Sequence, residues 1–567
     1  MKKLYIKITF LLFIFYLGSC ESSLEKFPLD QPSDATFFSN EDELNLAVNG
    51  AYTDIWWNEG RASLSVFLDG VTDLGFLRSN YYGGLQTISL GEHTTETGTF
   101  YNTWKHMYNG ISKCNNLLNN MDKAKDVVPE ANYNLIEAQA LFLRSYYYSW
   151  LISLYGDVPW ITTLQTLEES KIPRDPKSVI ITNLFSDLDK AAGILPEEWS
   201  GSDQGRATKG AAMALKARIA IEHNMWEEAA AAAKAVMDMK TYALFPDYEK
   251  LFTYEGQRSQ EVIFDMPFLI GFQDARLPRY QSTRNTGAWS TIVPSQVMID
   301  SYECTDGKLI SESPLYDPKN PFKNRDPRMF GSIITPQSVW AGFIFETHKD
   351  STETFRVESD GSMTRVANQD ATNPFASYTG YCWKKYTSEA DLPGNIDHSE
   401  LNEILIRYAE VLLIYAEAKI ELNQIDASVL EAINLVRARG YGVDAGDTGN
   451  YPAVSTTDQN ELRTIIRRER KIELANEGFR LKDIRRWEIA EFVMPGPLFG
   501  RPNKPYSYDN LTSAPTFDQF GHPSYGTDAD FYRVVHVRTF NPDRDYLWPI
   551  PQRDVDINDQ LVQNPNY

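Results

Sequence analysis

The sequence contains two pairs of consecutive amphipathic helices, and this pattern restricts the fold more than any other feature. The first pair is predicted over Thr208–Asp238, with a turn at His223 and Asn224. The second is predicted over Glu403–Leu422 and Asp426–Arg439. Apolar residues recur at intervals of three and four, which places them on one face of each helix. Both pairs are rich in small residues, and neither can bury its apolar face without neighbouring helices.

Further helices are predicted from the same periodicity at Glu41–Trp57, Phe100–Met121, Asn134–Leu154 and Asp458–Ala475. Asn40 is placed to cap the first of them, because its side chain can accept from the free amides of the first turn. Gly156 and Pro159 form a stop signal after the third. Together with the two pairs, which resemble tetratricopeptide units, these helices predict a mainly α fold on a scaffold of tetratricopeptide-like helix pairs.

Three stretches between the helical segments lack a long helical period: Pro267–Ser295, Asn320–Asp397 and Gly500–Asp530. They are rich in turn-forming residues and also in aromatic residues, which argue against disorder. Loops this long in a compact domain are usually functional or disordered, so we expect a loop-rich, irregular ligand-binding subregion. The expected organisation is a single domain over 41–567, a helical scaffold mainly at 41–260 and 400–490, and loop-rich insertions at about 265–400 and 495–545.

The N-terminus has the arrangement of a bacterial lipoprotein signal. Three lysines among the first seven residues precede an apolar run, Ile8–Leu17, which is too short to span a bilayer as a permanent helix. Leu17–Cys20 reads LGSC, which matches the lipobox. This spacing predicts a signal peptide at 1–19, diacylglycerol on the thiol of Cys20, and a polar tether at 20–40. The body of the protein would then be held at a membrane by lipid alone.

The charge and the cysteines exclude several classes of function. The net charge is −22, and removal of residues 1–19 would make it −25, because that segment contains three lysines and no acidic residue. This argues against binding to nucleic acid or to anionic lipid, both of which select basic surfaces. If Cys20 carries lipid, three cysteines remain, without zinc-binding spacing, so we expect no disulfide framework, no metal site and no cofactor.

The most densely charged segment, Arg467–Trp487, is predicted to be helical and carries Glu469, Glu473 and Glu477 at intervals of four residues. Two carboxylates on one helix face could serve as the acid and base of a glycosidase. However, the neighbouring arginines would keep them ionised, whereas a general acid needs a raised pKa. The composition therefore favours an arginine–carboxylate network that holds helices together, and we assign no catalytic residue.

Better candidates for a binding site lie outside the periodic segments. The stretch Asp69–Leu85 joins two predicted helices and combines tyrosines with polar residues beside a pair of glycines. Sugars have apolar C–H faces that pack on aromatic rings and a rim of hydroxyls that Asp, Asn and Arg can bind. An ordinary hairpin loop with exposed tyrosines is the alternative. The candidate ligand-binding residues here are Asp73, Arg78, Asn80, Tyr81 and Tyr82.

A second stretch, Arg276–Trp289, offers the same chemical mixture in irregular sequence. Each aromatic residue by itself is also compatible with a structural role. Two or three stacked contacts, each contributing on the order of 1 kcal/mol, would give weak capture in the micromolar to millimolar range. The candidates here are Tyr280, Arg284, Asn285 and Trp289, and Trp340 is a further aromatic candidate in loop-like sequence.

Several segments spread along the chain carry a family likeness. They are Ala138–Thr162 (AQALFLRSYYYSWLISLYGDVPWIT), Arg407–Ala418 (RYAEVLLIYAEA), Ile466–Trp487 (IRRERKIELANEGFRLKDIRRW) and Leu547–Tyr567 (LWPIPQRDVDINDQLVQNPNY), with shorter echoes at Asn434–Arg439, Tyr302–Gly307 and Asn324–Arg328. In this order, and with the lipobox, the segments resemble the SusD/RagB family of nutrient-binding outer-membrane lipoproteins of Bacteroidetes.

The resemblance implies a mostly helical fold of four tetratricopeptide-like helix pairs with an irregular, loop-rich face. It also implies a lipid-anchored protein that faces the cell exterior on the outer membrane and caps a SusC-like TonB-dependent barrel. Members hold an oligosaccharide, or in some cases a peptide, and pass it to the barrel without catalysis. In the family, the region that corresponds to Asp69–Leu85 often contributes to the binding face.

We therefore expect surface capture of an oligosaccharide or polysaccharide and its delivery to such a barrel, by a protein that is not an enzyme. Capture of peptides or glycoprotein fragments by the same architecture is the nearest alternative. A surface glycosidase would be recognised by turnover of a glycan. A helical-repeat adaptor without a small ligand would purify with a barrel but show no response to glycans.

Overall fold

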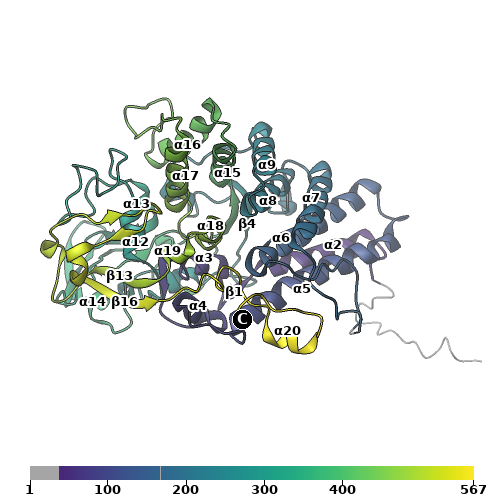
Figure 1. Ribbon diagram of the computed structural model, residues 1–567, viewed down its shortest axis with the longest axis horizontal. Coiled ribbons are helices and arrows are strands. Elements are labelled where there is room, and N and C mark those ends of the chain that lie inside the picture. Colours follow the sequence, from purple (N-terminus) through teal and green to yellow (C-terminus); the bar gives the residue numbers. More distant parts are fainter. Residues whose placement is uncertain (1–36, 167) are drawn as a thin grey trace, which may run out of the picture.

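The computed structural model describes residues 37–166 and 168–567. The predicted signal peptide, Cys20 and most of the predicted tether lie outside the described residues. In the described chain, long helices occupy one side of the molecule, and short strands with irregular connections occupy the other (Figure 1). The largest hydrophobic cluster includes residues from Phe38 to Leu561, so both sides share a core.

The helical side is an array in which each long helix packs against the next (Figure 1). Its helices are α2 (Glu41–Tyr52), α5 (Gly98–Asn120), α6 (Glu130–Tyr155), α7 (Lys177–Ile194), α8 (Lys209–Glu222), α9 (Trp226–Met239), α15 (Tyr408–Glu421), α16 (Ala427–Gly440), α17 (Gln459–Glu473) and α18 (Arg480–Arg486). Contacts run from α5 through α6, α7, α8 and α9 to α15, which also packs on α16 and α17. The mainly α fold expected from the periodicity is confirmed.

Capping and turn signals in the sequence correspond to real helix ends. The side chain of Asn40 accepts a hydrogen bond from the amide of Glu43 at 3.0 Å and so caps α2. The hairpin predicted at 208–238 is formed by α8 and α9. Thr208 caps α8 by accepting from the amide of Ala211 at 3.1 Å. These local bonds satisfy first-turn amides that would otherwise lack partners.

Two elements differ from the sequence expectation. α7 was not predicted, because its β-branched run Val179–Ile181 has a low helix propensity; packing of its apolar face on α6 and α8 outweighs that propensity. The prediction that a helix begins at Glu403 is wrong. Glu403–Arg407 is strand β12, which pairs antiparallel with β4 (Val262–Met266). All five residues of β12 are buried, and α15 begins only at Tyr408.

The other side is built from short antiparallel strands. Its pairs are β1 (Asn58–Glu59) with β2 (Ala62–Ser63), β3 (Gly75–Leu77) with β5 (Ile292–Pro294), β6 (Ile333–Ile334) with β11 (Cys382–Trp383), β13 (Gly496–Pro502) with β16 (Tyr532–Arg538), and β14 (Thr516–Phe517) with β15 (Pro523–Ser524). A four-stranded sheet has the order β10 (Met363–Ala367), β9 (Glu353–Val357), β8 (Phe343–Ile344), β7 (Val339–Trp340).

Short helices connect these strands to each other and to the array. They are α3 (Leu64–Asp69), α4 (Leu85–Leu90), α10 (Tyr248–Leu251), α11 (Leu277–Gln281), α12 (Gln296–Ser301), α13 (Arg328–Ser332), α14 (Gln369–Thr372), α19 (Ala490–Val493) and α20 (Gln552–Ile557). α3 packs against α18, so the strand-rich side is joined directly to the helical side.

A buried network of arginines and carboxylates lies where the two sides meet. Nη1 of Arg407 is 2.9 Å from Glu261 and 2.7 Å from Glu473, and its Nε is 2.7 Å from Glu477. Arg439, at the end of α16, binds Glu261 at 2.5 Å and also binds Glu473. The arginine–carboxylate network expected from the sequence is therefore present, and its partners come from four separate segments of the chain.

The network keeps its carboxylates ionised in spite of their burial. Removal from water alone would raise the pKa of Glu473, but Arg439, Arg407 and Arg328 outweigh that effect and hold the pKa well below its usual range. Arg328 comes from α13 on the strand-rich side and lies 3.1 Å from Glu473. Glu473 is thus an ionic contact between the two sides, and its pKa is the opposite of what a general acid requires.

The charged segment is not the continuous helix that the sequence suggested. α17 ends at Glu473 and α18 begins at Arg480, so Glu473 and Glu477 do not share a helix face. Between them, Asn476 and Gly478 have φ angles of 60° and 81°. A Cβ on Gly478 would lie 2.3 Å from the carbonyl oxygen of Ser65, so the close approach of α3 requires glycine there. The turn allows Glu477 to face Arg407.

Two groups of buried carboxylates should give stability an optimum in mildly acidic solution. Glu473 has a lowered pKa, so its contribution is present above its ordinary value of 4.5 and is lost as the pH falls. Burial raises the pKa of Asp69 and of Glu403 to about 7, so folding becomes less favourable as the pH rises through that value. We expect the midpoint of thermal unfolding, measured by calorimetry, to fall on both sides of the optimum. A midpoint that rises steadily into alkaline solution would contradict this balance.

Candidate functional site

Two of the candidate stretches meet because the strands beside them pair. β3 leads into residues 78–84, called here the first loop, and pairs with β5, which follows residues 276–291, the second loop. The amide of Arg78 donates to the carbonyl oxygen of Thr291 at 2.9 Å, which extends this ladder by one residue. The Arg78 side chain also donates to the carbonyl oxygen of Trp289 at 3.1 Å. The two loops therefore form adjoining walls of one surface.

The base of this surface is fixed by an ion pair rather than left free for a ligand. Asp73, one of the candidates, is 3% exposed, and Arg480 binds its two carboxylate oxygens at 2.8 and 2.9 Å. Asp69, one turn earlier, accepts from the backbone amide of Glu477 at 3.1 Å. Asp73 thus connects the turn before β3, which leads into the first loop, to α18 and the buried network. It is therefore removed from the set of candidate ligand contacts. The sequence gives no sign of a partner 407 residues away.

Four aromatic rings from the two loops and α3 pack edge to face. The ring centroid of Tyr280 lies 5.4 Å from that of Tyr81, 5.5 Å from Phe67 and 5.3 Å from Trp289. Phe67 and Tyr280 are buried and form the floor of the cluster. Tyr81 and Trp289 are only partly buried and present ring surface to solvent. Edge-to-face packing of this kind fixes ring orientation, so Tyr81 and Trp289 are held in defined positions.

Polar candidates of the second loop lie beside these rings and are held by hydrogen bonds. The guanidinium of Arg284 donates to the carbonyl oxygen of Ala288 at 2.9 Å and to Asn373 at 3.0 Å. The side-chain oxygen of Asn285 accepts from the amide of Gln369 at 2.9 Å. The side-chain amide of Asn285 also donates to Asn368 at 3.3 Å. Arg284 and Asn285 remain partly exposed, on the same loop as Tyr280 and Trp289.

A third loop, residues 369–378, completes the surface, and the sequence reasoning did not single it out. Phe375 is 56% exposed, its ring lies 5.2 Å from the guanidinium of Arg78, and its carbonyl oxygen accepts from Arg78. Tyr378 stacks on Phe76 of β3, with ring centroids 6.1 Å apart. The stretch NPFASYTGY mixes aromatic and turn-forming residues as the other two loops do, so its composition could have indicated it.

The remaining candidates make local contacts. Asn80 is exposed, and its side chain accepts from the amide and the hydroxyl of Thr87 at 2.9 and 3.0 Å. Tyr82 has a φ angle of 51°, and its ring packs edge to face on Trp57. Trp340 is 3% exposed, and its indole N–H donates to Ser282 at 2.9 Å. Trp340 is therefore a core residue and is removed from the set, whereas Asn80 and Tyr82 flank the exposed ring of Tyr81.

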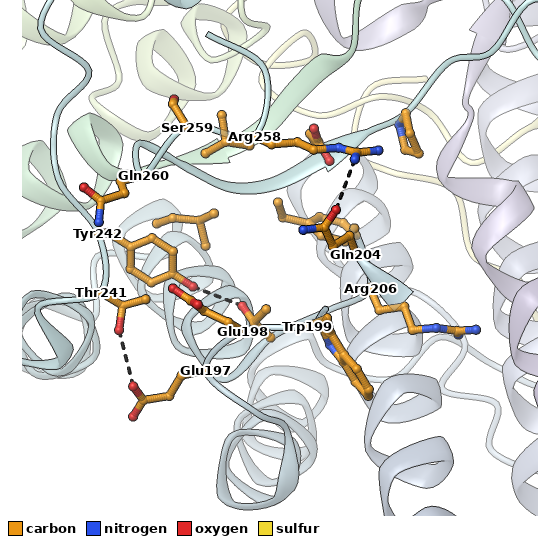
Figure 2. Close-up of a pocket in the computed structure, with 17 residues that line it drawn as sticks. Glu197, Glu198, Trp199, Gln204, Arg206, Thr241, Tyr242, Arg258, Ser259 and Gln260 are labelled. Atoms are coloured by element: carbon orange, nitrogen blue, oxygen red, sulfur yellow. Dashed lines mark hydrogen bonds between the residues drawn. The ribbon is translucent and has the colours of Figure 1, made fainter. Parts of the chain in front are cut away.

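A separate cavity of 260 Å³ lies on the helical side, between residues 197–208 and residues 258–267 (Figure 2). Its polar side chains bind one another: Arg258 with Gln204 at 3.1 Å, Thr208 with Tyr242 at 3.1 Å, and Thr241 with Glu197 at 3.3 Å. Ligand pockets usually have a volume of roughly 300–1,000 Å³. The cavity is small by that measure, and none of the candidate residues lines it. We favour the three-loop surface because it brings Tyr81, Arg284 and Trp289 together.

The described residues limit the chemistry that is available. Within residues 37–166 and 168–567, no group of three or more His, Cys, Asp or Glu side chains is arranged to hold a metal ion. The cysteines of that part, Cys114, Cys304 and Cys382, are buried and unpaired. No helix among the same residues is long and apolar enough to cross a bilayer. The three loops offer aromatic rings, guanidinium groups, amides and hydroxyls, together with the buried carboxylate of Asp370.

Comparison with known protein families agrees with this architecture. The family described as "Starch-binding associating with outer membrane" matches residues 25–221. The family described as "SusD family" matches residues 249–567, which is more than half of the chain. The chain belongs to the SusD family. The resemblance inferred from the sequence is confirmed, and the two matches cover the loop-rich side and most of the helical array, with α9 in the interval between them.

Individual SusD-like proteins align over most of the chain. SusD-like protein P25 of Formosa agariphila is 27% identical over 523 residues, which are 85% of this chain and 89% of that protein. SusD-like protein P2 of the same organism is 26% identical, with 99% of each chain covered. The crystal structure of a SusD-like carbohydrate binding protein from Bacteroides fragilis superposes with a TM-score of 0.79 and 28% identity, over 93% of this chain and 100% of that chain.

The placement of Asp73 predicts a loss of stability when it is replaced. Asp73→Ala leaves the buried guanidinium of Arg480 without its partner, which should lower the free energy of unfolding by about 3–5 kcal/mol in urea titrations. Asp350→Ala is the matched control, because its ion pair with Lys504 is exposed and should contribute at most about 1 kcal/mol. Equal stability of the two variants would show that Asp73 does not anchor the first loop.

Proposed function

We propose that the protein captures an oligosaccharide or polysaccharide at the cell surface, on the face formed by Tyr81, Trp289 and Phe375. The observation that carries the proposal is the convergence of three loops that are far apart in the sequence. Their pairing places partly exposed rings beside guanidinium and amide groups. A SusD-like relative of known structure is described as carbohydrate binding, which supports the same class of ligand.

The chemistry of this face matches that of a sugar chain. A pyranose ring packs its C–H face on an aromatic ring, while its hydroxyls accept from groups such as the Arg284 guanidinium and the Asn285 amide. Because Tyr280 and Phe67 hold the exposed rings in place, little ordering entropy is lost on binding. Two or three such contacts give an affinity that permits release, as a protein that passes its cargo onward requires.

We also propose that the glycan is bound without being cleaved. A retaining glycosidase needs two carboxyl groups about 5 Å apart, one of them ionised and one protonated. Asp73 is bound by Arg480, and Asp370 of the third loop is 2% exposed and accepts from the amides of Arg284 and Asn285. Neither carboxylate is free to reach a glycosidic bond above the rings.

The proposed destination of the glycan is a SusC-like TonB-dependent barrel, with the protein anchored in the outer membrane through lipid on Cys20. Membership of the SusD family supports delivery to such a barrel. The LGSC sequence at Leu17–Cys20 supports the lipid anchor, together with the match to a family described as associating with the outer membrane. A lipid anchor would keep the three-loop surface near the barrel and raise its effective concentration there.

Removal of an exposed ring should weaken glycan binding. Phe375→Ala and Trp289→Ala each delete one stacking face, so we expect the affinity for a glycan identified by array screening to fall about fivefold to tenfold in calorimetric titrations. Phe272→Ala is the matched control, because Phe272 is 90% exposed but lies outside the three loops. Circular dichroism would verify that each variant is folded.

Two results would contradict the binding proposal. If no glycan on a broad array binds the purified protein, or if Phe375→Ala and Trp289→Ala both bind glycan as tightly as the wild type, the three-loop surface is not a glycan site. Steady release of shorter sugars by the wild-type protein would contradict binding without cleavage.

Anchoring and partnership can be tested together in a Bacteroidetes host. The wild-type protein should incorporate labelled palmitate, fractionate with the outer membrane, and co-purify with a TonB-dependent barrel after detergent extraction. Cys20→Ala should lose the label and the membrane association, because it removes the thiol that would carry the lipid, and no helix among the described residues is long and apolar enough to cross a bilayer. Retention of the label by Cys20→Ala would refute the assignment of the lipid, and purification of the wild type without a barrel would refute the partnership.

A further inference from the structure

Two guanidinium groups contact the same ring of the third loop. Arg78, from the first loop, and Arg533, from β16, lie 6.0 and 5.2 Å from the ring centroid of Tyr378. Arg78 is also held by the carbonyl oxygens of Trp289 and Phe375. Cations placed over an aromatic face are attracted by its quadrupole, so the ring orients both groups without neutralising their charge.

Two more cations complete what we call the basic rim: Arg78, Arg284, Lys349 and Arg533. Arg284 donates to Asn373, and the ammonium of Lys349 donates to the carbonyl oxygen of Ala371 at 3.1 Å. All four side chains are partly exposed. They come from the first loop, the second loop, the connection between β8 and β9, and β16, so the fold gathers four cations around the third loop.

The charges of the basic rim are not balanced by neighbouring carboxylates. In the described part of the chain, none of its four members forms an ion pair, whereas Arg276 and Arg279 of the second loop both bind Asp397. The whole sequence has 77 acidic and 55 basic residues, so carboxylates are abundant elsewhere. Unpaired cations gathered on one rim of an acidic protein require a counterion from solution or from a ligand.

One acidic residue, Asp370, lies close to the rim and compensates it only in part. Its carboxylate accepts from the backbone amides of Arg284 and Asn285. Burial raises the pKa of Asp370 to about 7, so at neutral pH a substantial fraction of this group is uncharged. The nearest buried acid therefore leaves most of the positive charge of the rim in place.

We propose that the glycan bound by this surface is anionic, carrying carboxylate groups of uronic acids or sulfate esters that dock on the basic rim while the sugar rings pack on Trp289, Tyr81 and Phe375. This inference rests on the proposed glycan-binding function and names the charge of the ligand. Guanidinium groups whose position is already fixed by carbonyls and rings retain outward donors, which suit the paired oxygens of carboxylate or sulfate.

The positive charges of the basic rim repel one another when no anionic ligand is bound. Burial lowers the pKa of the Lys349 ammonium, and the nearby positive charge of Arg533 lowers it further. The second effect shows that the charges of Lys349 and Arg533 repel each other. An anionic group placed among them would relieve this repulsion and gain charge-assisted hydrogen bonds. The acidic remainder of the protein repels polyanions in general, so binding of a charged glycan depends on this local cluster.

Matched pairs of polymers test the charge of the ligand. Affinity electrophoresis and calorimetry would compare polygalacturonate with its methyl ester, and dextran sulfate with dextran, within a wider panel of uronate-containing, sulfated and neutral glycans. We expect at least one anionic member to bind about tenfold or more tightly than its neutral counterpart. The uronate and sulfate arms show which of the two groups is recognised. Poly-glutamate serves as a polyanion without sugar rings and should not bind.

Variants of the rim make the test specific. The double variant Lys349→Gln and Arg533→Gln removes two charges that have no ion-pair partner, so the fold should be retained, and binding of the anionic glycan should weaken about tenfold. Lys240→Gln, an exposed charge at the end of α9, is the matched control and should change nothing.

The experiments distinguish failure of the anionic assignment from failure of the proposed glycan capture. Equal or tighter binding of the neutral partners, or unchanged affinity in the double variant, would overturn the anionic assignment while leaving glycan capture intact. Binding of poly-glutamate as tight as that of the anionic glycan would overturn it as well. Absence of binding to every glycan in the panel would overturn the proposed function itself.

Discussion

The buried contact of Arg407 with Glu473 and Glu477 is the interaction on which the arrangement of both sides of the molecule depends. Arg407 stands where β12 becomes α15, Glu473 closes α17, and Glu477 lies in the turn that leads to α18. Loss of one partner from a buried ion pair leaves an unpaired charge in the core, which lowers the free energy of unfolding by about 3–5 kcal/mol. The helical array and the strand-rich side are therefore held in one relative position, because only that position pairs all of the charges.

The same network fixes the position of the chain segment that leads into the proposed binding surface. The backbone amide of Glu477 donates to Asp69, and Arg480 binds Asp73, so the end of α3 and the turn before β3 are fixed to α18. From there β3 pairs with β5, and Arg538 of β16 donates to the carbonyl oxygens of Thr72, in the turn before β3, and of Gly75, the first residue of β3. A rigid ionic centre thus supports three loops that need little internal regularity, which explains how irregular sequence can present aromatic rings in fixed positions.

The sequence was most informative where the structure depends on local signals. Helix periodicity and caps such as Asn40 depend on neighbouring residues, so these elements were predicted closely, and composition alone identified two of the three loops. The roles of Asp73 and Trp340 could not be predicted, because each depends on a partner distant in the chain, Arg480 and Ser282. The strand at β12 was mistaken for helix because its burial on all sides is a tertiary property.

The division of the surface among three separate loops has a consequence for how the protein would respond to the ligand proposed here. Any partly opened form in which one loop has come away lacks either the rings or the cations of the face, and so has little affinity for the ligand. A ligand that binds only the complete assembly shifts every opening equilibrium by the same amount, about 2.7 kcal/mol at a free concentration one hundred times its dissociation constant. Occupancy by the proposed ligand would therefore slow hydrogen exchange in all three loops together and protect all three from proteolysis.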